Sequence, residues 1–183
     1  VGVVSVDQQL YNDDFRSLEK TFSLLTQVVG RSGRGELKGK AIIQTLTPEN
    51  EVIRLAARQD YDAFFDTEIR LRRALVYPPY CDLCVVGFAG TDETVVKTAA
   101  RNALELLKRH LAGEFKGEKA IILGPMPARV AKVSGKFRYR LIIKCRNTGG
   151  MRRLISRLLI ETGEDSRFSK VTAYADINPD STV

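Results

Sequence analysis

Residues 128–145, ARVAKVSGKFRYRLIIKC, decide the fold that we expect for the second half of the chain. Apolar and aromatic residues alternate largely with basic ones on both sides of Ser134-Gly135. Alternation with a period of two is typical of half-buried strands, and a Ser-Gly pair between two such runs is typical of a hairpin turn. The pattern therefore predicts a hairpin with strands at 128–133 and 137–145.

The segments around this hairpin extend it to an α/β unit. An apolar run lies on each side of it, and an amphipathic helical pattern separates each run from the hairpin. The predicted elements are strand 81–89, helix 93–111 with Thr91 or Asp92 as its cap, a strand segment from 120–123, the hairpin, helix 151–160 and strand 170–177. The resulting β-α-β-β-α-β order predicts an α/β sandwich.

The basic residues of the hairpin are candidates for DNA binding. Most are two positions apart, which places them on one face of adjacent strands, with Phe137 and Tyr139 on the other. The set is Arg129, Lys132, Lys136, Arg138, Arg140 and Lys144. Any sheet with one solvent-exposed face has the same pattern, so we expect the two aromatic residues in the core rather than stacked on bases.

Positive charge is concentrated around the hairpin. The chain has a net charge of +7, but the segment from Lys116 to Arg157 holds 12 Lys and Arg against one acid, Glu118, which gives +11. The remainder of the chain is therefore net negative. Such a block favours a polyanionic partner, above all nucleic acid, because phosphates release counterions when cations neutralise them. The alternative is a solvated basic face that raises solubility.

The first half of the chain has the pattern of a β-α-β unit. A β-branched strand at 1–7 ends in Asp7, an amphipathic helix follows at 17–29, and a second apolar strand covers 39–46. A buried parallel strand delivers its last residue to the carboxyl edge of the sheet, where we place Asp7. The pattern predicts one β-α-β unit with parallel strands.

Two further helices are predicted before a boundary. One begins at Thr47 as its cap with Pro48 in its first position, and the next covers 60–75. The residues of the second helix expected in the core are Tyr61, Phe64, Phe65, Ile69 and Leu75. The rigid segment YPPY at 77–80 then marks a boundary. The predicted division is 1–58, a linking helix and turn at 59–79, and 80–183.

Residues 27–35, QVVGRSGRG, follow the predicted helix 17–29 directly. Arg31 and Arg34 are one helical turn apart, and each guanidinium offers a planar fork of donors that suits phosphate oxygens. The flanking glycines let another backbone come close. A Gly/Arg-rich turn is also typical of a solvated helix end, where basic side chains complement the helix dipole.

Composition limits the chemistry that the chain can perform. The chain has 183 residues, 44% of them hydrophobic, and no apolar run of 18 residues, so we expect a cytosolic protein with a core. Cys81, Cys84 and Cys145 lack the second Cys pair or nearby histidine of a zinc site, so we expect buried thiols and no metal. The only histidine, His110, is expected to contact a helix end rather than to catalyse.

Residues 27–34 resemble the sixth motif, Q-x-x-G-R-x-G-R, of superfamily 2 nucleic-acid translocases. The resemblance implies that Gln27, Arg31 and Arg34 contact ATP bound with Mg²⁺ on another lobe, with the arginines at the γ-phosphate. It also implies cofactor-binding roles for Gly30, Gly33 and Asp7. The chain has no G-x-x-x-x-G-K-[ST] segment, so alone it is expected to lack ATPase activity.

Further motifs resemble the PriA family of bacterial replication-restart helicases, also called primosomal protein N′. They are DFR at 14–16, RRAL at 72–75, YPP at 77–79, LGP at 123–125, PA at 127–128, GKFRY at 135–139 and DINP at 176–179. Asn178 departs from the aspartate that is usual in the last motif. The resemblance implies a partial RecA-like helicase lobe followed by a C-terminal domain similar to ribosomal protein S10.

By this resemblance the chain is the C-terminal part of an ATP-dependent 3′-to-5′ DNA helicase. The family recognises stalled replication forks and initiates primosome assembly. Its nucleotide-binding lobe, N-terminal DNA-binding domain and zinc-binding cysteines would lie upstream of residue 1. Asp7 and the segment DFR at 14–16 match the motif that couples nucleotide state to DNA and lobe closure, although Asp14 and Glu19 equally suit a helix start.

The resemblance implies single-stranded and forked DNA, single-stranded DNA-binding protein and other primosome proteins as partners, in the bacterial cytoplasm at the nucleoid and without a membrane. Arg152 and Arg153 are the candidates for contacting an acidic tail of the single-stranded DNA-binding protein. The alternative from another class is a non-enzymatic nucleic-acid-binding module whose Gly/Arg segment only holds phosphate backbone.

Overall fold

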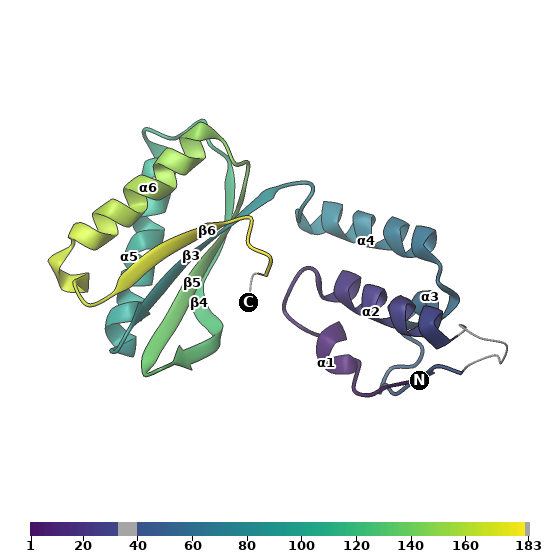
Figure 1. Ribbon diagram of the computed structural model, residues 1–183. Helices are drawn as coiled ribbons and strands as arrows, with labels where there is room; N and C mark the ends of the chain where they lie inside the picture. The colour runs from purple at the N-terminus through teal and green to yellow at the C-terminus, as the bar shows by residue number, and fades with distance from the viewer. Residues whose placement is uncertain (33–39, 182–183) are drawn as a thin grey trace. The chain divides into compact units, whose positions relative to one another are not determined.

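A computed structural model describes residues 1–32 and 40–181 of the chain (Figure 1). The chain forms two compact units, Val1–Leu75 and Val76–Val183, and each is described by itself. The predicted linking segment 59–79 includes helix α4, Tyr61–Leu75, which is part of the first unit. No helix in the described part of the chain is long and apolar enough to cross a membrane.

The second unit has the predicted β-α-β-β-α-β order. Its elements are β3 (Asp82–Gly90), α5 (Glu93–Ala112), β4 (Ala120–Val133), β5 (Lys136–Cys145), α6 (Gly149–Glu164), the 3₁₀ turn η1 (Ser166–Phe168) and β6 (Thr172–Ile177). The four strands form one antiparallel sheet in the order β4-β5-β3-β6. The hairpin is confirmed, although β4 is one long strand with register shifts after Leu123 and Pro127 instead of two pieces.

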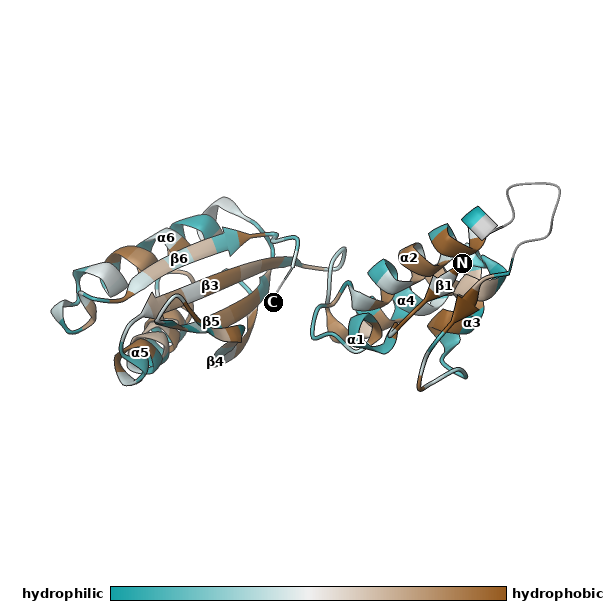
Figure 2. Cartoon of the chain, turned by 60° about the horizontal axis from the view of Figure 1, so that its bottom comes forward, coloured by the Kyte–Doolittle hydropathy of each residue, from teal (hydrophilic) through white to brown (hydrophobic). Residues whose placement is uncertain are grey.

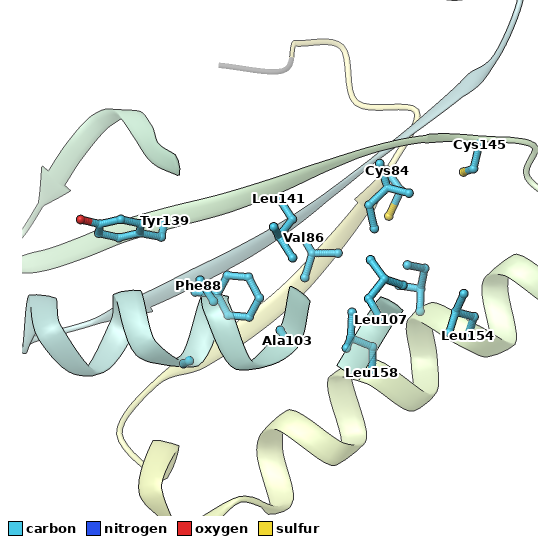
Figure 3. Packing of buried hydrophobic residues seen from close by; sticks show 14 of the residues in the cluster. Cys84, Val86, Phe88, Ala103, Leu107, Tyr139, Leu141, Cys145, Leu154 and Leu158 are labelled. Atoms are coloured by element: carbon cyan, nitrogen blue, oxygen red, sulfur yellow. The ribbon is translucent and has the colours of Figure 1, made fainter. Parts of the chain in front are cut away.

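Helices α5 and α6 cover one face of this sheet (Figure 1). The core between them takes every second residue of β3 and β5, as the side chains in Figure 3 show. The fully buried side chains include Phe88, Leu107, Leu141, Leu154 and Leu158. Because side chains alternate across a strand, the intervening residues of β3 and β5 lie on the opposite, open face of the sheet.

A side chain caps the first turn of each of these helices. The Asp92 side chain accepts a hydrogen bond from the Val95 amide at 3.1 Å, which selects Asp92 over Thr91 as the cap of α5. Thr148 accepts one from the Met151 amide at 2.9 Å and caps α6. Each cap satisfies an amide that the first helical turn leaves without a partner. Figure 2 shows hydrophobic stretches in β3 and β5, the two central strands of the sheet.

The first unit contains the predicted β-α-β connection in a shorter form. Its elements are β1 (Gly2–Val3), α1 (Asp7–Leu10), α2 (Ser17–Ser32), β2 (Ile42–Ile43), α3 (Glu51–Arg58) and α4 (Tyr61–Leu75). The two strands are parallel, with Gly2 opposite Ile42 and Val3 opposite Ile43. The predicted strand 1–7 was too long: Ser5 has a positive φ of 58°, and Asp7 already begins a helix.

Two expectations for the helices of this unit were wrong. Asn50, not Thr47, caps α3 and accepts a hydrogen bond from the Val52 amide at 2.9 Å, because Thr47 bonds to Asp7 instead. On α4 only Phe64 of the predicted core residues is buried, stacked on Phe22 with ring centroids 4.1 Å apart. The others are exposed or half-buried: Tyr61, Phe65, Ile69 and Leu75.

Candidate functional site

The last turns of α2 carry the described part of the Gln/Arg motif. Gln27 and Arg31 are exposed and four residues apart, so both lie on one side of the helix. Gly30 lies against α3: a Cβ at this position would be 3.2 Å from Nε2 of Gln59. Gly33 and Arg34 lie outside the described residues. The helix thus presents an amide and a guanidinium, and its glycine permits close approach of Gln59.

Asp7 lies where α1 begins and holds the segment that follows β2. Its carboxylate accepts hydrogen bonds from Thr45 Oγ1 at 2.7 Å and from the Leu46 amide at 3.1 and 3.2 Å. The Thr45 hydroxyl is the main reason that the pKa of Asp7 lies below its usual value. Thr47 Oγ1 also donates to it, at 3.4 Å. In this structure Asp7 therefore ties together the two segments that follow the parallel strands.

Asp14 and Glu19 both make contacts inside the first unit. Buried Asp14 accepts hydrogen bonds from the Arg16 amide at 3.1 Å and from Lys20 Nζ at 2.8 Å, at the start of α2. Glu19 accepts one from Arg72 Nη2 at 2.7 Å. These contacts fit the helix-start interpretation of Asp14 and give Glu19 a role in joining α2 to α4.

Arg72 connects these residues to Phe15. Its Nε donates to the buried Glu68 at 2.8 Å, and its guanidinium lies 5.4 Å from the centroid of the Phe15 ring. Arg16 lies 5.1 Å from the same ring. Burial lowers the pKa of Arg72, but the bonds to Glu68 and Glu19 outweigh it and raise the pKa above the usual value. The pair of carboxylates thus keeps Arg72 charged and fixed.

The basic residues of the hairpin differ strongly in exposure. Four of them, Lys136, Arg138, Arg140 and Lys144, alternate along β5 on the open face of the sheet, as predicted. Arg129, Lys132 and Lys136 are exposed and Arg138 is half-buried, but Arg140 and Lys144 are buried. The hairpin tip is therefore the more accessible part of the predicted DNA-binding set.

The Tyr77 ring lies against the buried Lys144. The Lys144 ammonium lies 3.6 Å from the centroid of the Tyr77 ring, and it lines a pocket together with Cys81. Burial lowers the pKa of Lys144. The ammonium therefore makes its attractive contact with an aromatic ring of the same unit.

Of the two aromatic residues expected in the core, Tyr139 is there and Phe137 is not. Tyr139 is buried in the helix-covered core and donates its hydroxyl proton to Glu93 at 3.0 Å. Burial raises the pKa of Tyr139, and the bond to Glu93 adds to this effect. Phe137 is half-buried, with Lys132 Nζ 4.4 Å from its ring centroid. Tyr139 therefore serves packing and is not a base-stacking platform.

A pocket of about 240 Å³ lies on the open face of the sheet. Its lining is Val85, Ala128, Arg138, Tyr139, Arg140, Tyr174, Asp176, Pro179 and Ser181. Tyr174 is 41% exposed there, and its hydroxyl accepts a hydrogen bond from Arg138 Nη2 at 3.5 Å. The sequence patterns did not single out Tyr174 as a site residue, because nothing near it in the chain indicates which residues the sheet places beside it.

The remaining candidates lie on the helices. Arg152 and Arg153 are exposed in the first turn of α6, and Arg152 Nη1 donates to Asn147 Oδ1 at 3.1 Å. His110, buried near the end of α5, lies 3.0 Å from a Glu161 oxygen of α6 and joins the two helices. Within residues 1–32 and 40–181, no group of His, Cys, Asp and Glu side chains is arranged as a metal site requires.

The three cysteines are free and buried, as expected. Burial raises the pKa of Cys84 to about 12 and that of Cys145 to about 11. The pKa of Cys81 is also raised by burial, and its Sγ lies 3.2 Å from the Val76 carbonyl oxygen. Thiols held in the protonated form are poor nucleophiles and poor metal ligands.

Comparison with known proteins identifies the family. Residues 73–180 match the family model described as "Primosomal protein N C-terminal domain". The chain is similar to replication restart protein PriA of Bacillus subtilis, with 36% identity over 179 residues, which is 98% of this chain and 22% of that protein. Identity to the PriA protein of Thermotoga maritima is 38% over 158 residues, 86% of this chain and 20% of the relative.

A third similar protein is PriA of Synechocystis, with 38% identity over 144 residues, 79% of this chain and 17% of the relative. The chain thus spans about a fifth of the length of the curated relatives that it matches. The family match begins on α4 and extends through β6, and the relatives extend the similarity over nearly the whole chain. The chain therefore belongs to the PriA family and contains its C-terminal domain.

Proposed function

We propose that this chain is the C-terminal part of an ATP-dependent 3′-to-5′ DNA helicase that acts in replication restart. The observation that carries the proposal is the family membership, since the named relatives are replication restart proteins and the alignment covers 98% of this chain in the first of them. In this proposal the complete protein recognises stalled forks, starts primosome assembly and works in the cytoplasm at the nucleoid.

The first unit would provide one half of a composite ATP site. Gln27 and Arg31 are exposed at the end of α2, so another lobe carrying ATP and Mg²⁺ can reach them. Arg31 and Arg34 would stabilise the charge that develops on the transferred phosphoryl group, and Gln27 would sense the nucleotide. Gly30 and Gly33 would permit close approach of the nucleotide-binding lobe, while Asp7 would hold the neighbouring segment.

The second unit would bind DNA through the hairpin. Its exposed cations, Arg129, Lys132 and Lys136, lie in the segment of net charge +11, and Arg138 continues them onto the sheet. Cations that contact phosphates release counterions, so binding should weaken steeply as salt is added. Arg152 and Arg153 would receive an acidic tail of single-stranded DNA-binding protein, and other primosome proteins would join the complex.

The test of the ATP-site proposal is DNA-stimulated ATP hydrolysis by a longer protein that includes the upstream lobe and its zinc-binding region. We expect Arg31→Ala and Arg34→Ala each to lower the turnover number by about 10³-fold or more, because that is the usual contribution of an arginine finger. Arg58→Ala, which removes an exposed cation at the end of α3, is the matched control and should leave turnover unchanged.

Hydrolysis that survives both substitutions would contradict the helicase proposal for the first unit. It would favour the second candidate function, in which this chain is a nucleic-acid-binding module that takes no part in the hydrolysis. In that case the same substitutions should reduce DNA binding and its dependence on salt instead of turnover. The two functions are thus separated by measuring both quantities on the same variants.

A further inference from the structure

The open face of the sheet in the second unit places an aromatic ring beside two guanidinium groups. Helices α5 and α6 both pack on the other face (Figure 1). On the open face, Arg140 of β5, Gly87 of β3 and Tyr174 of β6 lie in one row, because Gly87 is the register partner of both other residues. Arg138 lies two positions along β5 from Arg140, on the same side.

Gly87 makes room for the Tyr174 ring. A Cβ atom built on Gly87 would lie 2.3 Å from Tyr174 Cζ, a distance that no side chain allows. The ring therefore lies directly over the Gly87 backbone, which supports one side of it. Tyr174 is nevertheless 41% exposed, so the ring keeps a solvent-facing surface. An aromatic surface supported from below and open above is what a nucleobase needs for stacking.

Side chains of opposite charge lie on the two sides of Tyr174. Along β3, Arg138 is opposite Ala89, Tyr174 is opposite Gly87, and Asp176 is opposite Val85. The guanidinium and the carboxylate thus lie at opposite ends of the pocket, with the ring between them. A phosphate is attracted to the Arg138 end, from which β5 continues to the exposed Lys136 at the hairpin tip. At the other end Asp176 repels it.

We propose that this pocket binds one nucleotide of single-stranded DNA, with its base stacked on Tyr174 and its phosphate at Arg138. The neighbouring backbone then runs along β5 toward Lys136 and the hairpin tip. Duplex DNA is excluded, since its bases are already stacked on one another and only an unpaired base can reach the ring. The proposal rests on DNA binding by the second unit. It adds the position on that unit at which single-stranded DNA binds.

The chain offers a direct optical test because it contains no tryptophan. Tyr174→Trp places a single fluorophore at the proposed stacking position in the 183-residue chain. We expect oligo(dT) to quench its fluorescence in a saturable manner, and a blunt duplex of the same length to leave it unchanged. Tyr61→Trp, at an exposed tyrosine of the first unit, is the control and should show no quenching by either.

Affinity measurements on four variants test the proposed roles separately. Tyr174→Ala should weaken oligo(dT) binding by about 5- to 160-fold, the range found for one stacked base, and Tyr174→Phe should retain most of it. Arg138→Ala should lower the salt slope by about 0.7, as expected for one phosphate of a single strand. Asp176→Asn should have the opposite effect and tighten binding by about twofold or more, because a repulsive charge is removed.

Three outcomes would overturn the inference. They are a Tyr174→Ala chain that binds oligo(dT) as tightly as the unmodified chain, unchanged Trp fluorescence, and equal quenching by duplex. If Lys132→Ala with Lys136→Ala then abolishes binding, DNA is held at the hairpin tip alone and the proposed function stands. If the unmodified chain binds no oligo(dT) at low salt, DNA binding by the second unit is itself wrong.

Discussion

Asp7 shows how a residue that we predicted as a ligand contact can also stabilise the structure. Its carboxylate accepts bonds from Thr45 and from the Leu46 amide, and these bonds require the charged form. A carboxyl whose pKa is lowered by folding stabilises the folded state above its unfolded pKa, near 3.8, and loses this effect as the pH falls through the folded pKa.

We therefore predict that Asp7→Ala destabilises the first unit at pH 7, and that the difference from the unmodified chain begins to shrink near pH 4 and vanishes only below the lowered pKa of the folded state. Urea titrations followed through the NMR signals of Leu25, which is fully buried in this unit, measure the effect. Asp13→Ala removes an exposed carboxylate nearby and should have little effect at either pH. A difference that persists unchanged at pH 3 would contradict the role of the charge.

The cysteines give a second prediction at the residue scale. At pH 8 a thiol with a pKa of about 12, as for Cys84, is ionised in about one molecule in 10⁴, against roughly a quarter of molecules for a free cysteine. We expect iodoacetamide to modify Cys84 and Cys145 at least about 100-fold more slowly in the folded chain than in urea, as followed by peptide mass spectrometry. Rapid modification of the folded chain would show that the sheet opens readily.

At the scale of elements, regular periodicity made the second unit predictable. Helix 93–111 was expected from its apolar face and is observed as Glu93–Ala112. Period-two alternation also assigned Tyr139 to the core and Arg138 to the other face. The pairing of Gly87 with Tyr174 was not predictable, because it depends on the register of strands 87 positions apart in the chain.

The elements of the first unit were predicted less well, because side-chain hydrogen bonds there outweigh the preferences of single residues for helix positions. Thr47 and Pro48 have the residue types of a helix start. The Thr47 hydroxyl, however, donates a hydrogen bond to Asp7, and Asn50 caps the helix three residues later. The aromatic residues of α4 are typical of a core helix, yet Tyr61 and Phe65 are 61% and 47% exposed. Apolar periodicity alone does not show which surface covers a helix face.

The contact between β3 and β6 leads to a prediction about two glycines. Gly87→Ala forces a Cβ into the Tyr174 ring, and overpacking of this kind costs about 1–3 kcal/mol of the free energy of unfolding. Gly163→Ala, on α6, should stabilise the unit by up to about 1 kcal/mol, because a Cβ there meets no atom within 4 Å and alanine favours the helix.

Urea unfolding of the single variants and of Gly87→Ala with Tyr174→Ala tests this contact. Removing the ring should relieve most of the cost of the added methyl group, so the double variant should be more stable than the sum of the single effects predicts. Strict additivity would mean that the ring does not lie over Gly87, and the stacking platform proposed for Tyr174 would then lose its support.

At the scale of the whole molecule, the chain contains two separate cores. All buried apolar residues of one core lie between Val6 and Phe64, and all those of the other lie between Cys84 and Phe168. Among residues 1–32 and 40–75, the first core has seven buried apolar residues: Val6, Leu10, Phe22, Leu25, Ile53, Ala56 and Phe64. The unit around it also exposes large apolar side chains, including Val4, Ile42 and Leu46.

These cores predict different behaviour for the two units when each is produced alone. Residues 76–183 should unfold cooperatively with the same urea midpoint as in the 183-residue chain and should bind oligo(dT) with the same affinity, because their core and the proposed DNA contacts lie within that range. Residues 1–75 should have a lower midpoint or no cooperative transition, since a small core only marginally offsets the entropy lost on folding. Circular dichroism during urea titration measures both.

A 76–183 fragment that unfolds without a transition would mean that its sheet depends on the first unit. An equally stable 1–75 fragment would show that the small core of this unit suffices to hold Gln27 and Arg31 in place.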